Sequence, residues 1–161
     1  GLLDPGDDRG KFFRLAFGAA GGFGSEVDPM EAKAVIEPLA TSDGRTTLYW
    51  GVPAGLMPKK AVKVLLNLVL IAKDALVRGG ELHVGAEARE GEQEIVIRAT
   101  GPRIIMDQSV RDALSGELTE SQIDSRTAAA WMVRGLCAAN GGLVQIAGPD
   151  DTQIVIGALV R

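Results

Sequence analysis

Apolar residues recur at helical spacing in several stretches of the chain. The longest stretch begins at Pro58 and is stopped by the glycine pair at 79–80. Its apolar positions share one helical face, namely Ala61, Val62, Leu65, Leu66, Val69, Ala72 and Leu76. Another helix is predicted to start at Asp28 and to reach about Ala40, because Asp28 suits an N-cap, Pro29 follows it, and the first turn carries an acid.

Between the helical stretches, the pattern changes to the alternation that is typical of strands. From Glu81 onward, apolar residues at 82, 84, 86 and 88 alternate with polar ones, and a turn at 90–92 leads into a second alternating segment. The predicted strands cover residues 46–52, 81–88, 95–99, 143–147 and 152–159, and two further helices cover residues 107–114 and 125–139. This order predicts an α+β fold, a two-layer sandwich with helices on one face of a mixed, mostly antiparallel sheet.

The first part of the chain differs from the rest in its aromatic content. All four phenylalanines lie between residues 12 and 23, and residues 11–20 form a helical pattern that is apolar around most of its circumference. A helix of this kind needs several neighbours to cover it. We therefore expect it to be a separate element, and we divide the chain at residue 24.

Composition excludes several classes of function. The formal net charge is -4, the pI is about 5.0, and no basic run is longer than Lys59-Lys60, so nucleic acid is not expected as a partner. The longest apolar stretch is too short to span a bilayer, which predicts no membrane contact, and the acidic start does not resemble a signal peptide. The only cysteine, Cys137, is expected to be a buried thiol in a reducing compartment, so we expect a cytoplasmic protein.

Three segments in a fixed order resemble the Bergerat-fold superfamily of histidine kinases, gyrases and heat-shock chaperones. Residues 65–75, followed by Gly79 and Gly80, resemble its first nucleotide-binding box. The strand at residues 95–101 stands where the second, glycine-rich box is found, and residues 131–146 match the last helix and the strand after it. The resemblance implies a Bergerat-type sandwich.

The nucleotide ligands of that superfamily are replaced in this chain. Asn67 is retained, but Ile71 stands where a second asparagine helps to hold Mg²⁺, and isoleucine offers no oxygen to a hard cation. Ala99 stands where an acid reads the adenine amino group, and only Gly101 remains of the glycine motif that follows. The last phosphate-binding box aligns with four residues that crowd the helix start, Thr127, Ala128, Ala129 and Ala130. The resemblance therefore implies a domain that holds no ATP and needs no cofactor or metal.

Within the superfamily, the chain resembles the ChpT-type histidine phosphotransferases of alphaproteobacteria. That resemblance implies a homodimer whose helical hairpins form a four-helix bundle, with residues 1–24 as a remnant of the bundle and residues 25–161 as the degenerate ATPase-like domain. It also implies that the protein accepts a phosphoryl group from the receiver domain of a hybrid histidine kinase and passes it to response regulators. Phe13, Arg14 and Phe17 are then the candidates for contacts with partner proteins.

The chain departs from this family at its most important residue. The acceptor histidine should lie on a helix and precede an acid, yet the only histidine, His83, lies in a predicted strand and precedes Val84. We expect His83 to be an ordinary solvated residue, because no second histidine or nearby cysteine could share a metal with it. No catalytic residue is therefore assigned within the chain.

Several alternatives remain open. Asn67 is either a relic of nucleotide binding or a polar residue that makes local hydrogen bonds. The aromatic helix is either core alone or core and docking surface together. The whole domain could instead be an interaction module that sequesters a partner without carrying phosphate, or an active Bergerat-fold kinase or ATPase with unusual ligands.

Overall fold

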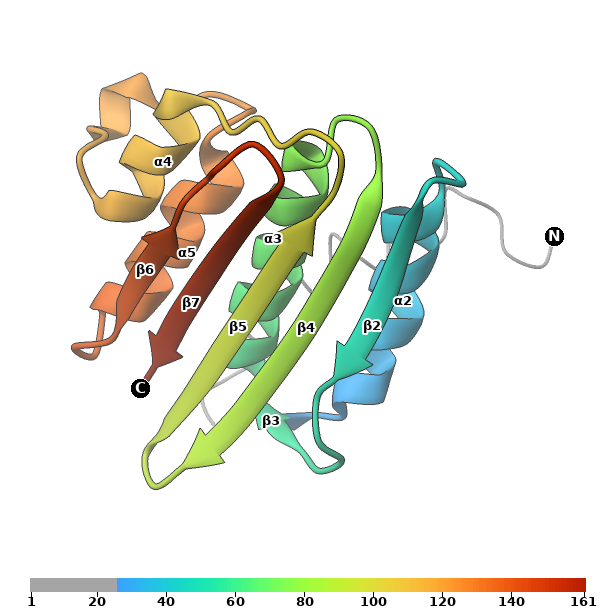
Figure 1. The fold of residues 1–161 in the computed structure, drawn as a ribbon. Helices are drawn as coiled ribbons and strands as arrows, with labels where there is room; N and C mark the ends of the chain where they lie inside the picture. The colour runs from blue at the N-terminus through green and yellow to red at the C-terminus, as the bar shows by residue number, and fades with distance from the viewer. Residues whose placement is uncertain (1–25) are drawn as a thin grey trace, which may run out of the picture.

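The computed structural model describes residues 26–161, which form a five-stranded sheet with helices on one face (Figure 1). The strand order is β2-β4-β5-β7-β6; β2 runs parallel to β4, and all other neighbours are antiparallel. The strands are β2 (Thr46–Gly51), β4 (Gly80–Arg89), β5 (Glu92–Thr100), β6 (Leu143–Ala147) and β7 (Gln153–Val160). Two short strands, β1 (Glu26–Val27) and β3 (Met57–Pro58), pair with each other away from this sheet.

Four α-helices form the second layer. They are α2 (Pro29–Thr41), α3 (Lys59–Ala75), α4 (Gln108–Ser115) and α5 (Ala128–Ala138). Three of them pack on the sheet, with α3 across its centre, α2 against β2, and α5 against β6 and β7; α4 packs mainly on α5. The predicted α+β sandwich with about three helices on one face of a mixed sheet is confirmed.

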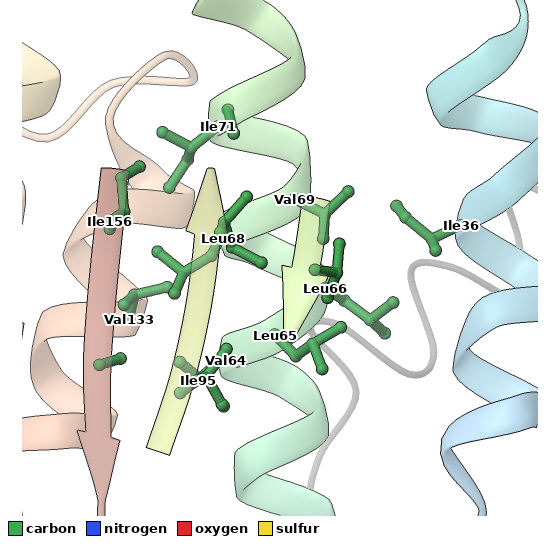
Figure 2. Close-up of a cluster of buried hydrophobic side chains, with 14 of the residues drawn as sticks. Ile36, Val64, Leu65, Leu66, Leu68, Val69, Ile71, Ile95, Val133 and Ile156 are labelled. Atoms are coloured by element: carbon green, nitrogen blue, oxygen red, sulfur yellow. The ribbon is translucent and has the colours of Figure 1, made fainter. Parts of the chain in front are cut away.

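The core lies between α3 and the sheet. Most of α3 is buried, and its leucines and valines meet the inward side chains of β5 and β7, such as Ile95 and Ile156 (Figure 2). Full burial of one such side chain stabilises a fold by roughly 1.5–3 kcal/mol. Cys137 is also fully buried, as predicted, and burial raises the pKa of its thiol to about 11.

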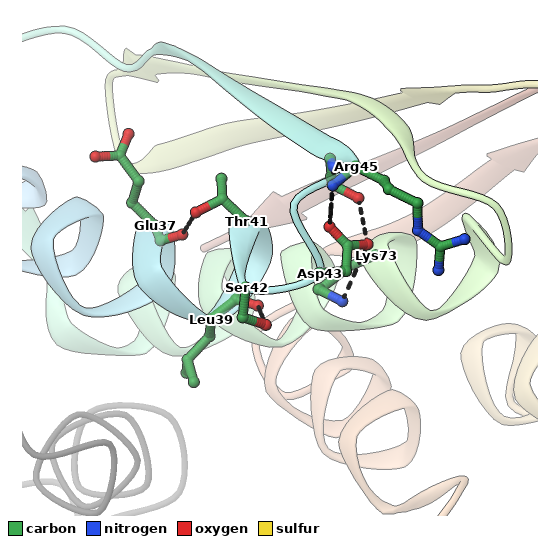
Figure 3. A network of polar contacts seen from close by, with 8 residues as sticks. Glu37, Leu39, Thr41, Ser42, Asp43, Arg45 and Lys73 are labelled. Atoms are coloured by element: carbon green, nitrogen blue, oxygen red, sulfur yellow. Dashed lines mark hydrogen bonds and ion pairs between the residues drawn. The ribbon is translucent and has the colours of Figure 1, made fainter.

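The turn between α2 and β2 is held by one carboxylate (Figure 3). Asp43 accepts hydrogen bonds from the backbone N–H groups of Arg45 at 2.8 Å and Thr46 at 2.9 Å, and from the Thr46 hydroxyl. Those hydrogen bonds, led by the one from Arg45, hold the pKa of Asp43 below its ordinary value. Lys73 of α3 lies 4.0 Å from the same carboxylate, so the start of β2 is attached to the end of α3.

Two features differ from the sequence-based expectation. Helix α3 ends at Ala75, several residues before the glycines that were expected to stop it, because Leu76 forms a β-bridge with Ile104. The Ala75 carbonyl accepts a hydrogen bond from Ile105 N–H at 3.0 Å, which ties the last turn of the helix to the segment after β5. The β1–β3 pair was not predicted, because two-residue strands are too short to show alternation.

Candidate functional site

The positions of the former nucleotide ligands are built into the apolar core. Ala99 is fully buried on β5, and its cross-strand neighbours are Leu82 on β4 and Ile154 on β7, both of which are also fully buried. Ile71 is 7% exposed and lies among the apolar side chains of α3 (Figure 2). Side chains without any polar atom therefore stand where the resemblance places the adenine-reading acid and the Mg²⁺-binding amide.

Asn67 is the retained polar residue of this box, and it is fully buried. Its Nδ2 donates to the Lys63 carbonyl at 2.8 Å, one helical turn earlier, and lies 3.9 Å from the sulfur of Met132 on α5. The hydrogen bond to Lys63 is local, as expected if Asn67 is a polar residue that makes local hydrogen bonds. The amide thus helps to join α3 to α5.

A cavity of about 410 Å³ remains beside Ile71 at the C-terminal end of α3. Its walls come from α3, from the segments after β5 and before α5, and from α4, and they combine apolar side chains with three charged groups, Asp74, Asp107 and Arg126. Partial burial raises the pKa of Asp74, and nearby Lys73 opposes that shift. Two carboxylates against one guanidinium make this cavity unfavourable for a triphosphate.

The start of α5 is occupied by a carboxylate of the chain itself. Asp124 Oδ1 accepts hydrogen bonds from the backbone N–H groups of Arg126 at 2.9 Å and Thr127 at 3.0 Å, while the Asp124 carbonyl accepts one from Ala128 N–H at 3.0 Å. Exposed N–H groups at a helix start are the groups that bind phosphate in many nucleotide sites. Here the Asp124 carboxylate binds the two N–H groups that precede the helix, and the Asp124 carbonyl binds that of its first residue, Ala128.

An ion pair lines the cavity. Arg126 Nη1 lies 2.5 Å from Asp107 Oδ2, and both residues belong to the cavity wall. Neither residue was singled out in the sequence, because the two are 19 positions apart. The turn that Asp124 holds could have been found, since an Asp side chain often accepts hydrogen bonds from backbone N–H groups just after it.

Gly101 is the one residue that remains of the glycine motif after β5. It must be glycine because the backbone around it is packed too closely for a side chain. A Cβ at this position would lie 2.4 Å from the carbonyl oxygen of Gly79 and 3.1 Å from Leu76 Cδ2. The end of β5 therefore crosses the α3–β4 connection with no room for a side chain. The glycine is explained without any ligand.

The low pKa of Asp124 predicts a pH effect on stability. Its hydrogen bonds, led by those from Thr127, favour the carboxylate, so its pKa is lower in the folded than in the unfolded chain. The resulting stability is present above the unfolded pKa and is lost as pH falls through the folded one. In urea unfolding at pH 7, Asp124→Asn should have a lower free energy of unfolding than wild type. At pH 3 the difference in free energy between the two proteins should be smaller.

A matched control for that experiment is Asp151→Asn, which changes an exposed acid on a turn. Its difference from wild type should stay small at both pH values. If Asp124→Asn differs from wild type by the same free energy of unfolding at pH 7 and at pH 3, the ionised carboxylate has no stabilising role.

His83 lies far from this cavity, on the sheet face that no described helix covers. Its ring stacks on Tyr49, with centroids 4.6 Å apart and planes within 7°, and its Nε2 lies 3.5 Å from Glu81 Oε2. It is partly exposed and belongs to a strand, as predicted. Phe13, Arg14 and Phe17 lie outside the described residues, so the structure does not place them.

Among the described residues, 26–161, no group of three or more His, Cys, Asp and Glu side chains comes together as potential metal ligands. No helix within the same range is long and apolar enough to cross a membrane.

Comparison with known proteins connects this geometry to one family. The family model of the histidine phosphotransferase C-terminal domain matches residues 29–152. Protein phosphotransferase ChpT of Brucella abortus (strain 2308) is 32% identical over 117 residues, which are 73% of this chain and 56% of that protein. This chain therefore spans about half the length of that curated relative.

Solved structures give the same result for the fold. A bacterial phosphotransferase superimposes with a TM-score of 0.80 at 29% identity, covering 94% of this chain and 72% of its own. The catalytic domain of histidine kinase ThkA superimposes with a TM-score of 0.62 at 13% identity, covering 87% of this chain and 95% of its own. The first likeness extends to sequence, whereas the second shows the fold alone.

Proposed function

We propose a phosphorelay role for this chain, which belongs to the histidine phosphotransferase family. In this role the whole protein receives a phosphoryl group from the receiver domain of a hybrid histidine kinase and delivers it to the receiver domains of response regulators. It works without ATP, and we place it in the cytoplasm, where such regulators act.

One observation carries the proposal: the positions that would hold a nucleotide are occupied by groups of the chain itself. Ala99 and Ile71 are buried among apolar side chains, and Asp124 accepts hydrogen bonds from the N–H groups of Arg126, Thr127 and Ala128 where the chain enters α5. A family member without a nucleotide site must obtain its phosphoryl group from another phosphoprotein. The acyl phosphate of a receiver aspartate is the natural donor in this family.

The transfer itself requires a histidine on a helix. An imidazole nitrogen attacks the phosphorus atom, a P–N bond forms, and the P–O bond to the donor aspartate breaks; transfer to the next receiver reverses these changes. Positioning and charge stabilisation supply most of the catalysis, with Mg²⁺ held by the receiver's acidic pocket. The 161 residues contain no histidine that fits this role, since His83 lies on β4. We therefore place the acceptor on a bundle helix of the whole protein.

The proposed organisation follows from the same family membership. Residues 1–24 would belong to the helical bundle through which two copies form a homodimer, and residues 25–161 would form the appended domain that holds no nucleotide. Phe13 and Phe17 would then pack inside the bundle, with Arg14 nearer to the docked receiver.

Transfer of radioactive phosphate tests this function. The full-length protein is mixed with a receiver domain that carries ³²P on its aspartate, and we expect acid-labile, alkali-stable label on the protein within minutes. His83→Gln should take up the same amount of label, because His83 is not the acceptor. Absence of label on the full-length protein would overturn the relay proposal.

The same experiment separates the interaction-module alternative from the relay. A sequestering protein would bind the phosphorylated receiver in a pull-down assay and take up no label. Label that disappears in His83→Gln would instead assign the chemistry to β4 and contradict the placement of the acceptor on a helix.

A further inference from the structure

The sheet face opposite the helices carries no described helix or strand. In Figure 1 this face is turned toward the viewer, and the helices lie behind it. Apolar side chains stand on it without cover, with Tyr49 46% exposed on β2 and Leu143 41% exposed on β6. Uncovered apolar surface on a soluble domain often marks a binding site.

Glycines form a row across the middle of this face. The strand register places Gly51 beside Gly85, Gly85 beside Val96, and Val96 beside Gly157, so that three of four neighbouring strands have a glycine at the same level. The registers continue without a bulge through all of these pairs. A row of this kind lowers the middle of the sheet surface.

Two of these glycines are not required by the fold. A Cβ at Gly85 would have no atom within 4 Å, and one at Gly157 would meet only the Ile95 carbonyl at 4.0 Å; neither residue has a positive φ. Glycine inside a strand weakens the sheet, and it often marks close approach of a ligand or of another backbone. These two glycines therefore indicate that a ligand or another polypeptide approaches this face of the sheet closely.

Two depressions of about 600 and 780 Å³ lie along the row and meet at Val96 and Val155. We call this feature the open-face channel; its floor is Gly51, Gly85, Val96 and Gly157, with Gln145 at its β6 end. Side chains of the same face recur about every 6.8 Å along a strand, so the two rows that flank the floor stand about 13–14 Å apart. That is the spacing of the Cα atoms, and an α-helix about 10–12 Å wide with its side chains would lie over the floor and pack against the side chains of both rows.

The length of the channel also suits a helix. Five strands spaced about 4.8 Å apart give a row of about 19 Å, which corresponds to roughly 13 helical residues at 1.5 Å per residue. An added β-strand would need an unpaired sheet edge. The three central strands β4, β5 and β7 are paired on both sides, and the free edges of β2 and β6 lie only at the two ends of the channel.

The walls of the channel differ along its length. Over β6 and β7 both walls are apolar, formed by Val155 and Ala147 on one side and by Leu143 and Leu159 on the other. Over β4 and β5 they are charged. One of these walls is Glu87 and Glu94, both within 3.7 Å of Arg89.

The other charged wall contains the cation that is available to a partner. Arg98 stands beside His83, which is already in contact with Glu81. The guanidinium of Arg98 has no ion-pair or hydrogen-bond partner among residues 26–161. The pattern is complementary to a helix that is apolar at one end and carries a carboxylate near its middle, where it crosses β5.

We propose that the open-face channel binds an amphipathic α-helix of a partner protein. The apolar end of that helix would lie over Leu143, Val155 and Leu159 on β6 and β7, and a glutamate or aspartate near its middle would pair with Arg98 on β5. This proposal does not depend on phosphotransfer, since neither His83 chemistry nor the cavity beside Ile71 takes part in it.

The test uses two synthetic helical peptides of 14 residues. Both carry leucines along one face, and they differ in one residue that faces Arg98, which is glutamate in one peptide and glutamine in the other. Each is titrated into ¹⁵N-labelled protein. We expect saturable shifts in the amide signals of β4, β5 and β7 around the channel floor, with the glutamate peptide binding about fivefold more tightly. Arg98→Gln should remove that difference.

Filling the channel should block the peptide without harming the fold. The double variant Gly85→Val and Gly157→Val should bind at least tenfold more weakly while its melting temperature stays the same or rises. Thr47→Val, which puts valine on the same face outside the channel floor in place of a side chain of similar size, should bind like wild type.

Three results would overturn the proposal. One is no saturable shift with either peptide at millimolar concentration, and another is undiminished binding to the filled variant. The third is self-association of the wild-type protein in sedimentation that the filled variant loses, since that would make a second copy of this chain the occupant.

Discussion

Replacing Ala99 with aspartate is expected to destabilise this protein by about 4 kcal/mol or more at pH 7, because the new carboxylate would be buried without a partner. Ala99 is fully buried between Leu82 and Ile154, so no polar group of these neighbours can satisfy the charge. The variant restores the acid that reads adenine in ATP-binding relatives. Urea unfolding of the variant and of wild type measures the difference.

The pH dependence identifies charge as the cause. Burial raises the pKa of such an aspartate above its unfolded value of about 3.9, so the variant should lose stability as pH rises from about 4 through the folded pKa. Ala99→Asn, which has nearly the same size without the charge, should be less destabilised and show no such pH dependence. The difference between the two variants isolates the charge.

Titration with Mg-ATP tests the alternative that the chain is an active kinase or ATPase. Wild type and Ala99→Asp should both give no saturable heat when titrated with Mg-ATP at millimolar concentration. An Ala99→Asp variant that stays within 1 kcal/mol of wild type and gains saturable ATP binding would show an intact nucleotide cleft. That result would favour the active-kinase alternative.

Replacing Gly101 with alanine should cost about 3 kcal/mol, because overpacking a tight backbone crossing typically costs 1–3 kcal/mol and sometimes more. The added methyl group would lie 2.4 Å from the Gly79 carbonyl oxygen. The backbone cannot easily move away, since Gly101 N–H donates to Thr152 and Gly80 N–H donates to Arg45. Denaturant unfolding checks the cost.

Gly135→Ala is the matched control for that variant. Gly135 is exposed on α5, and a Cβ there would have no atom within 4 Å, so alanine should stabilise the helix by up to about 1 kcal/mol. If Gly101→Ala were as stable as wild type, this glycine would need a functional explanation. A glycine kept from a nucleotide motif would then be the better interpretation.

The architecture was largely predictable because its signals are local. Alternation at residues 81–88 identified the inward face of β4, and Asp28 with Pro29 marked the start of α2. The α+β sandwich and the membership of the histidine phosphotransferase family are both confirmed. The predicted end of α3 was wrong, because the bridge between Leu76 and Ile104 stops the helix before the glycines. A contact between residues 28 positions apart cannot be seen in the local periodicity of the sequence.

For the candidate site, the sequence predicted only which nucleotide ligands are missing. Ile71 and Ala99 could be recognised because each replaces a polar residue at a known position in a motif. The contact between Arg126 and Asp107 could not be predicted, because the two residues are 19 positions apart and only the fold brings them together. The hydrogen bonds of Asp124 to Arg126 and Thr127 are local, so the sequence did carry a signal for them.

The amino-acid sequence by itself determined which segments become helices and strands, and which nucleotide ligands are missing, since both depend on residue type and short-range spacing. Only the tertiary structure decided how distant positions meet. Gly51, Gly85 and Gly157 are ordinary glycines in the sequence, separated by 34 and 72 residues. The register of β2, β4, β5 and β7 places them in one row, because pairing between strands sets which residues share a level of the sheet.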